Sequence, residues 1–343
     1  MALRDSKGIA LMMVLWVIAI LSLAALEFCF AMRTEVNITR NYEDAVRLHA
    51  AAEGALQRAI AELLLKHDAR LQQIRRNTRQ GEAPVDIQEL VTDGREYPVS
   101  FERIQCVFQV RGEGGKVNIN RVSDAVLRKI VGNMGLEGEA RDVVVDSIMD
   151  WKDADDFLRV NGAESEYYRS LRDPYDAKNA NLDCIEELLL VKGVTPELFY
   201  GRKERAREGE AVREVTPGMK DIFSIYAAGE QIDINSANLP VLRVVLSLPL
   251  EVCRLVMKAR EEKSFENIED LKARVPEIVP FLNEIGRFVM FGGMNPYYSV
   301  EARAKSETGY SGGGIRAVVK IDARDKEGYK IVQWLDSFQD FAK

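Results

Sequence analysis

Cysteine and histidine are scarce in this chain, whose 343 residues include four cysteines and two histidines. The cysteines are widely spaced and form no Cys-x-x-Cys pair, which argues against a structural zinc site and against a disulfide framework. Either one disulfide joins two of Cys106, Cys184 and Cys253, or all three are buried free thiols. The two histidines, His49 and His67, fall within a predicted helix, and we expect both on its surface rather than as ligands or bases.

Phosphate-binding and catalytic motifs are missing too. The stretch Gly114-Gly115-Lys116-Val117 lacks the first glycine of a phosphate-loop spacing and the Ser or Thr that would follow the lysine. A hydrolase built on Asp153 and Asp155 would need a nucleophile and a nearby histidine base, and the sequence supplies neither. We therefore expect a protein that is not an enzyme.

Basic residues are outnumbered by acidic ones, 47 against 54. The net charge is −7, and residues 139–187 alone contain 14 acidic and 6 basic side chains. Nucleic-acid-binding proteins usually carry a basic surface, so this balance argues against a nucleic-acid partner. It favours metal cations or a basic protein as partners of the acidic segment.

A long apolar run follows a short charged leader. Residues 9–26 are apolar apart from Ser22, and as a helix they reach most of the way across a hydrocarbon core of about 30 Å. Arg4 and Lys7 precede the run, so the positive-inside rule places the leader in the cytoplasm and the main domain in the periplasm, anchored by a single pass in the inner membrane. No small-residue cleavage site follows, which indicates that the helix is retained.

Two interpretations of the leader remain. It is either part of a plain membrane anchor or a leader similar to those of type IV pilins, which a prepilin peptidase would cleave between Gly8 and Ile9.

Beyond the membrane, apolar residues recur at three- and four-residue spacing and predict that the same helix continues to about Arg76. No proline occurs before Pro84. The apolar stripe must be covered, either by companion subunits or by the chain's own sheet; its members are Ala45, Leu48, Ala52, Leu56, Ala59 and Leu63.

Strand-like segments lie on both sides of a helical block. Strands are predicted near 95–118 and again near 296–336, where residues 325–328 form the turn of a hairpin. The block between them spans about 119–290, and its charged stretch 202–220 reads as an exposed loop.

The helical block contains an internal repeat. The motif Val117–Asn120 recurs as 232–235 at an offset of 115, and the motif at 185–188 recurs as 268–271 at an offset of 83. The first copy therefore carries about 32 extra residues, which we assign to the stretch after Asp150. In both copies an asparagine shortly before a leucine-rich run predicts a helix start with asparagine as N-cap.

An acidic loop in that extra stretch carries the chemistry. Carboxylates at alternating positions, Asp153 and Asp155 with Asp156 beside them, can turn toward one cation, and Glu164 can close the site after the turn at Asn161-Gly162. Without a cation the like charges would repel one another. A calcium site and a solvated acidic loop are the two interpretations, and a second group of candidate ligands comprises Asp176, Asn179 and Asp183.

Four unusual strings are spread along the chain: Lys7-Gly8-Ile9, residues 146–156, residues 161–164 with Tyr167-Tyr168, and residues 186–198. Together they resemble the K subunits of type II secretion systems, which are minor pseudopilins. Pilins usually carry glutamate at the fifth mature position. This chain has Met13 there, and K subunits are the pseudopilins that lack the glutamate.

The resemblance implies an α+β, pilin-like fold: a long N-terminal transmembrane helix packed on an antiparallel sheet, with a large inserted all-α domain. The two copies in that domain resemble SAM-like or helix-hairpin-helix units. The expected parts are a leader (1–8), a transmembrane helix (9–32), the pilin helix with the first strands (33–118), the inserted helical domain (119–290) and the C-terminal strands (291–343).

The resemblance also implies a function. Prepilin peptidase would cut after Gly8 and methylate Ile9, and the subunit would cap the tip of the pseudopilus, assisting its initiation and the export of folded proteins across the outer membrane. The implied partners are the I and J minor pseudopilins and the inner-membrane secretion platform, with structural Ca²⁺ in the helical domain. The alternative is a membrane-anchored DNA receptor that uses its helix-hairpin-helix-like copies.

Overall fold

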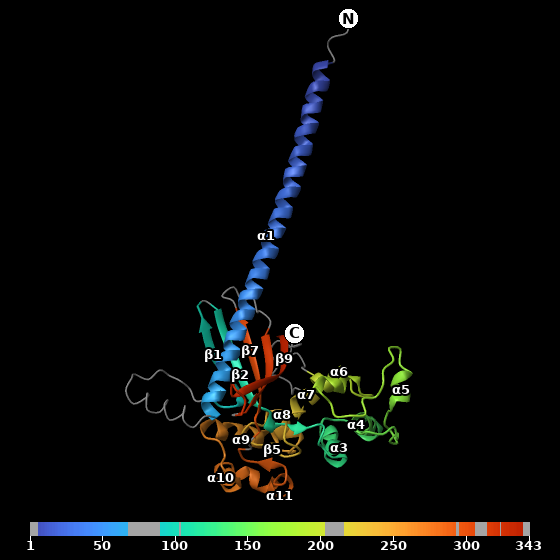
Figure 1. Cartoon of the computed structure of the whole chain (residues 1–343), viewed down its shortest axis with the longest axis vertical. Coiled ribbons are helices and arrows are strands. Elements are labelled where there is room, and N and C mark those ends of the chain that lie inside the picture. Colours follow the sequence, from blue (N-terminus) through green and yellow to red (C-terminus); the bar gives the residue numbers. More distant parts are fainter. Residues whose placement is uncertain are drawn as a thin grey trace, which may run out of the picture.

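The computed structural model describes residues 6–67, 90–102, 104–202, 216–292, 295–305, 314–322 and 324–338. Its first element is one continuous helix, α1 (Ser6–His67), whose N-terminal part extends far beyond the rest of the molecule (Figure 1). Within the described residues, α1 is the one helix long and apolar enough to cross a membrane. The predicted helix end near Arg76 lies outside the described residues.

Five antiparallel strands form the main sheet in the order β1-β2-β7-β8-β9. Their bounds are β1 (Asp93–Phe101), β2 (Ile104–Gly112), β7 (Tyr297–Lys305), β8 (Gly314–Ile321) and β9 (Tyr329–Phe338). The strand-like segment near 95–118 is a hairpin that turns at Glu102, where φ is +51°. Since β2 and β7 are hydrogen-bonded neighbours, residues 113–296 leave and re-enter the sheet at one place.

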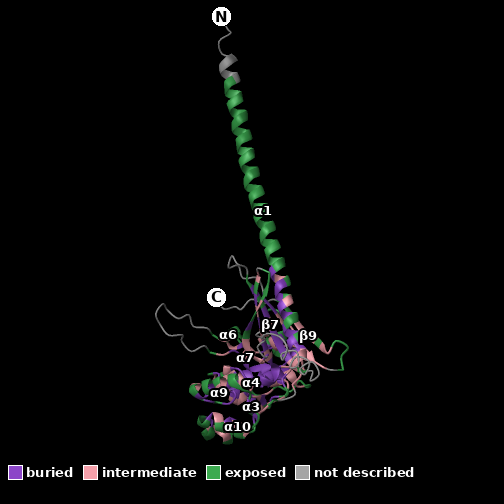
Figure 2. Cartoon of the chain, turned by 90° about the vertical axis from the view of Figure 1, so that its left-hand side faces the viewer, coloured by how far each residue is buried: buried purple, intermediate pink, exposed green. Residues whose placement is uncertain are grey.

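The C-terminal half of α1 covers one face of this sheet. Leu48, Ala52, Leu56, Ala59 and Leu63 are buried, in contact with the inward-facing side chains of β2, β7 and β8. In Figure 2 the residues of this helix change from exposed to buried along its length. The apolar stripe was expected to be covered either by companion subunits or by the chain's own sheet. Over residues 48–63 it is covered by the sheet, whereas Ala45 is exposed.

The segment between β2 and β7 is mainly helical and has its own core. It is not purely α, because β3 (Val117–Asn118) pairs with β4 (Phe223–Ser224) and β5 (Ile232–Asp233) with β6 (Val289–Met290) in short parallel ladders. The α-helices are α3 (Asp124–Asn133), α4 (Gly138–Lys152), α5 (Ser165–Arg169), α6 (Pro196–Tyr200), α7 (Met219–Ile222), α8 (Leu239–Val244), α9 (Leu250–Glu262), α10 (Ile268–Arg274) and α11 (Leu282–Ile285). The 3₁₀ helices are η1 (Glu113–Gly115), η2 (Ile185–Leu190) and η3 (Pro276–Phe281).

The internal repeat has a shared hydrogen-bond pattern. The side chain of Asn120 donates to the carbonyl of Leu182 (3.0 Å) and accepts from its N–H (2.8 Å). Asn235 makes the same pair of bonds with Phe265 (2.9 and 2.7 Å). The offsets between these residues are the 115 and 83 found in the sequence, so each copy uses one asparagine to hold two distant segments together.

Helix capping differs between the copies. Asn238 accepts a hydrogen bond from the N–H of Val241 at 2.9 Å and so caps α8, whereas Asn235, the repeated asparagine, bonds to Phe265 instead. In the first copy the N-cap is Ser123, whose side chain makes no capping bond. Part of the predicted loop 202–220 is also ordered, because Met219 is buried at the start of α7.

The cysteines and histidines, which are few in this chain, can be placed in the structure. All four cysteines are free: Cys106 and Cys253 are buried, whereas Cys184 is only partly buried. His67 is exposed on α1, as predicted, and its Nε2 lies 2.7 Å from the Tyr298 hydroxyl oxygen, whereas His49 is partly exposed.

We expect Leu56→Ala to destabilise the isolated chain by about 2–5 kcal/mol, because it opens a cavity between α1 and the sheet. Val46→Ala, on the same helix but half-exposed, should change the free energy of unfolding by less than about 0.5 kcal/mol. Urea unfolding of the full chain in detergent measures both. An unchanged midpoint for Leu56→Ala would contradict the packing of α1 on the chain's own sheet.

Candidate functional site

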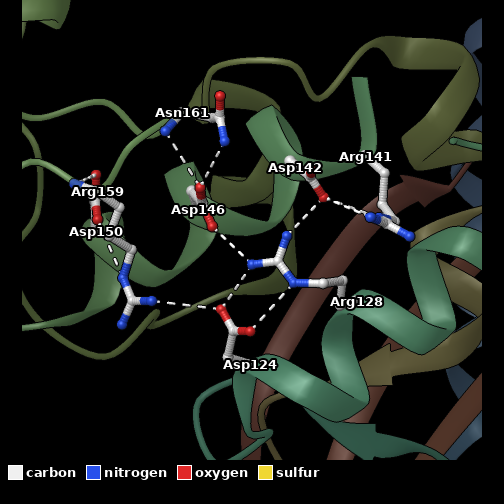
Figure 3. A network of polar contacts seen from close by, with 8 residues as sticks. All are labelled: Asp124, Arg128, Arg141, Asp142, Asp146, Asp150, Arg159 and Asn161. Atoms are coloured by element: carbon white, nitrogen blue, oxygen red, sulfur yellow. Dashed lines mark hydrogen bonds and ion pairs between the residues drawn. The ribbon is translucent and has the colours of Figure 1, made fainter. Parts of the chain in front are cut away.

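The acidic loop begins where α4 ends. Asp146 and Asp150 are four residues apart on α4 and therefore share one face of the helix. Both are buried, and both accept hydrogen bonds from the loop: the N–H of Asn161 donates to Asp146 (3.2 Å) and that of Arg159 donates to Asp150 (3.3 Å). Two helix carboxylates thus hold the returning half of the loop (Figure 3).

Ion pairs connect α4, at whose C-terminal end the loop begins, to the neighbouring helix α3. Arg128 on α3 reaches Asp124 (3.0 Å), Asp142 (2.7 Å) and Asp146 (2.8 Å), as Figure 3 shows. These bonds, those to Asp124 and Asp146 above all, raise the pKa of Arg128. Burial alone would raise the pKa of Asp146, but the hydrogen bonds from Arg128 and Asn161 outweigh it and lower that pKa.

Close packing leaves little freedom at the turn of the loop. A Cβ at Gly162 would collide with the carboxylate of Asp150, so glycine is required there. The Nζ atom of Lys192 donates to the carbonyl of Gly162 at 2.9 Å, which fixes the turn from the other side. The predicted turn at Asn161-Gly162 is therefore a tightly held one.

Several oxygen atoms around the loop are buried but accept no hydrogen bond in the described structure. They are Oδ1 of Asp150, Oδ1 of Asp153, both carboxylate oxygens of Glu164 and Oδ1 of Asn179. The Asp150 oxygen lies 3.4 Å from Nε of Arg159 as a long ion pair. Buried oxygens without donors are costly, and a bound cation is one way to satisfy them.

The pKa values of the loop carboxylates also favour a bound cation. Burial raises the pKa of Glu164 to about 7, and the negative charges of Asp150 and Asp153 add to the effect. Burial also raises the pKa of Asp150 to about 6 and raises that of Asp153. The loop therefore holds carboxylates that resist losing their protons near neutral pH unless positive charge is supplied.

The structure brings together only some of the predicted ligands. Asn179 was assigned to a second group, but its Nδ2 donates to Asp156 (2.8 Å), which places it at the first loop. Asp155 accepts from the N–H of Phe157 at 2.9 Å. The two remaining candidates are exposed and paired with basic side chains: Asp176 with Arg169 (2.5 Å) and Asp183 with Lys178 (2.6 Å).

No group of three or more His, Cys, Asp or Glu side chains in the described ranges is already arranged to hold a metal ion. A cation would therefore have to draw the buried oxygens closer together. Sequence reasoning missed Asp146 and Asp150 as site residues, although their four-residue spacing on a helix just before the loop was visible. It had no signal for the cross-helix role of Arg128, because two of its three partners, Asp142 and Asp146, lie on another helix.

Comparisons with known proteins concern the same part of the chain. A family model described as "Type II secretion system (T2SS), protein K" matches residues 109–201, which include the acidic loop. A putative type II secretion system protein K of Escherichia coli K12 is 24% identical over 215 residues, which are 57% of this chain and 60% of the relative.

Two further relatives carry the name type II secretion system protein K. That of Pseudomonas aeruginosa PAO1 is 24% identical over 284 residues, covering 80% of this chain and 78% of the relative. That of Pectobacterium carotovorum subsp. carotovorum is 34% identical over 74 residues, covering 22% and 23%. The chain thus spans less than two thirds of the length of two of these three relatives.

A solved structure shares the fold. It is a chain of the GspK-GspI-GspJ complex from enterotoxigenic Escherichia coli, matched with a TM-score of 0.55 and 14% identity. The match covers 89% of this chain and all of the solved chain. At this level of identity the likeness concerns the arrangement of helices and strands alone.

We expect Glu164→Gln to stabilise the metal-free chain at pH 7.5, raising Tm by a few degrees, because it removes a buried charge that nothing offsets. The pKa of Glu164 is raised in the folded state to about 7, from about 4.3 unfolded, so the folded state binds the extra proton. The stabilisation that this proton gives the folded state is complete below the pKa of the unfolded chain, and it is lost as pH rises through about 7.

Thermal melts in a chelator from pH 4 to pH 8 measure this effect. The fall in Tm with rising pH should be smaller in Glu164→Gln than in the unaltered chain. Glu166→Gln, which changes an exposed carboxylate two residues away, should leave the profile as it is. A lower Tm for Glu164→Gln throughout would contradict the account of an uncompensated buried charge.

Proposed function

We propose that this chain, which is similar to type II secretion system protein K, is a minor pseudopilin that caps the tip of the pseudopilus. In that role it assists initiation of the pseudopilus and the export of folded proteins across the outer membrane. The observation that carries the proposal is the continuous helix α1, which is exposed and apolar at one end and packed on its own sheet at the other.

The exposed end of α1 supports a single-pass anchor in the inner membrane. Described side chains from Leu11 to Leu26 are exposed, and they are almost all apolar. Lipid is the solvent that such a surface requires, because exposed apolar area of this extent is unfavourable in water. The folded part after the span then faces the periplasm.

Two features support a place at the tip. Met13 occupies the fifth mature position, where the glutamate of other pilins would pair with a neighbouring subunit's amine. An unpaired carboxylate in lipid is costly, so a subunit with no neighbour on that side does better without it. The helical block also lies at the end of the molecule away from the N-terminus, where its bulk would oppose addition of another subunit (Figure 1).

The proposed partners are suggested by the solved structure that shares the fold. Its chain was crystallised in a complex with GspI and GspJ. We propose the corresponding I and J minor pseudopilins as partners of this chain, with the prepilin peptidase and the inner-membrane secretion platform as the machinery that processes and inserts it.

We further propose that the acidic loop holds structural Ca²⁺. Calcium takes about six to eight oxygens in flexible geometry, and the loop offers unsatisfied buried oxygens from Asp153, Glu164 and Asn179, with Asp150 beside them. The positive charge would offset the repulsion that raises the pKa of Glu164. The ion would brace the loop between α4 and α5, which is a structural role with no reaction step.

Calcium should raise the Tm of the full chain in detergent after chelator treatment. At 100 times its Kd a ligand stabilises the folded state by about 2.7 kcal/mol, which is a shift of several degrees. Glu164→Gln should remove most of this shift, although the same substitution stabilises the metal-free protein. Asp183→Asn, whose side chain is 89% exposed and paired with Lys178, should keep the full shift. Equal shifts in all three proteins would show that the loop is not the site.

Coexpression with a prepilin peptidase should shorten the chain. We expect the intact mass to lose residues 1–8 and to gain one methyl group on Ile9, because the leader ends in Lys7-Gly8 before the apolar helix. Gly8→Leu should stay at full length under the same conditions. If residues 1–8 remained while the peptidase processed a known pilin, the chain would be a plain anchored protein and the pseudopilin proposal would fail.

A further inference from the structure

A second charged site lies on the face of the sheet that α1 leaves uncovered. Side chains alternate along β2, so Phe108 and Val110 contact α1 while Gln109 and Arg111 point to the opposite face. There a cavity of about 330 Å³ opens between the sheet and the helical block. Its walls come from β2, β7 and β8 on one side and from Lys116 and α7 on the other.

The cavity is strongly cationic. Asp221 and Glu301 are its acidic members, against five basic side chains: Arg111, Lys116, Lys220, Arg303 and Arg316. These cations come from positions between 111 and 316 in a chain whose net charge is −7. A concave surface lined by one sign of charge concentrates its electrostatic potential and attracts the opposite ion.

The acidic side chains of the lining are fewer than the basic ones. Glu301 is shared, at 3.5 Å from Arg303 and 3.8 Å from Arg316. Beneath the cavity, buried Glu113 lies 3.4 Å from Lys116 and accepts a hydrogen bond from the Ser299 hydroxyl at 2.5 Å. That carboxylate interacts electrostatically with Lys116 and with Arg316, so three acidic side chains face five basic ones.

Arg111 is the cation with most capacity left. Its side chain makes no hydrogen bond or ion pair with the described residues, yet its position is held. The guanidinium lies against the backbone of Gly94, where φ is +90° and a Cβ would collide with it. Arg111 and Arg316 also lower the pKa of Lys116, in addition to the larger effect of burial. The three cations are thus close enough to repel one another.

We propose that this cavity binds an oxyanion, a carboxylate or phosphate group, held by Arg111, Arg316 and Lys116. Guanidinium groups recognise such planar or tetrahedral oxyanions through paired N–H donors, and charge-assisted bonds of this kind are the strong ones. Two sources have the chemistry: a small free anion, and the acidic side chains of a protein segment. The site does not depend on the pseudopilin assignment, because it rests on the cavity and its charges alone.

Calorimetric titration of the full chain in detergent, at fixed ionic strength, tests the site with citrate, inorganic phosphate and an acetylated hexaglutamate peptide. We expect saturable binding with one site per chain. Arg111→Gln and Arg316→Gln should each weaken it about tenfold, which is the loss of one charge-assisted hydrogen bond. Lys305→Gln, an exposed cation of β7 outside the cavity, should bind as the unaltered chain does.

The three probes separate the sources. Tighter binding of the peptide than of citrate identifies a protein segment as the occupant, whereas the reverse order identifies a small free anion. Absence of saturable binding by all three probes would overturn the proposal. So would binding that is equally weakened in Lys305→Gln, or unchanged in both arginine variants with their circular dichroism intact.

Discussion

The packing of one face of α1 on the sheet is the interaction on which the rest of this structure depends. It buries the stripe from Leu48 to Leu63 against a sheet in which β2 and β7 are hydrogen-bonded neighbours, although residues 113–296 separate the two strands in the chain. Because both ends of the helical block attach to these two inner strands, the block is held at one end of the sheet. The acidic loop and the cationic cavity take their positions from that attachment.

Within the block, the carboxylates of α4 have different tasks because their surroundings differ. Asp146 is neutralised by Arg128, so its pKa falls and it acts as a fixed acceptor for the loop. Asp150 accepts a hydrogen bond from the N–H of Arg159 (3.3 Å) but has only a long ion pair with its guanidinium (3.4 Å), and Glu164 has no donor among the described residues. The first carboxylate gives the loop its shape, and the other two leave it short of positive charge. A rigid base with an unsatisfied interior is what a structural cation requires.

Local periodicity predicted most of the fold. Apolar residues at three- and four-residue spacing predicted α1, and alternating apolar residues predicted the strands. The offsets of 115 and 83 located a repeat, and the hydrogen bonds of Asn120 and Asn235 follow the same offsets. What covers the stripe on α1 could not be predicted, since a companion and the chain's own sheet satisfy the same pattern. The sequence also could not show which acidic residues lie close together. Whether Asp176 meets Lys178 or Arg169 depends on loop geometry, which composition does not encode.

Net charge concealed the two sites in different ways. A value of −7 hints at the acidic loop, whose residues are contiguous, but it hides the cavity, whose cations meet only after the sheet has formed. Both sites share one physical origin: like charges are brought together in a partly buried place, where water screens them poorly. Folding has to work against that repulsion, so a ligand of opposite charge stabilises the folded state as it binds. The acidic loop and the cationic cavity should therefore respond to opposite ions, and added salt should weaken binding at both.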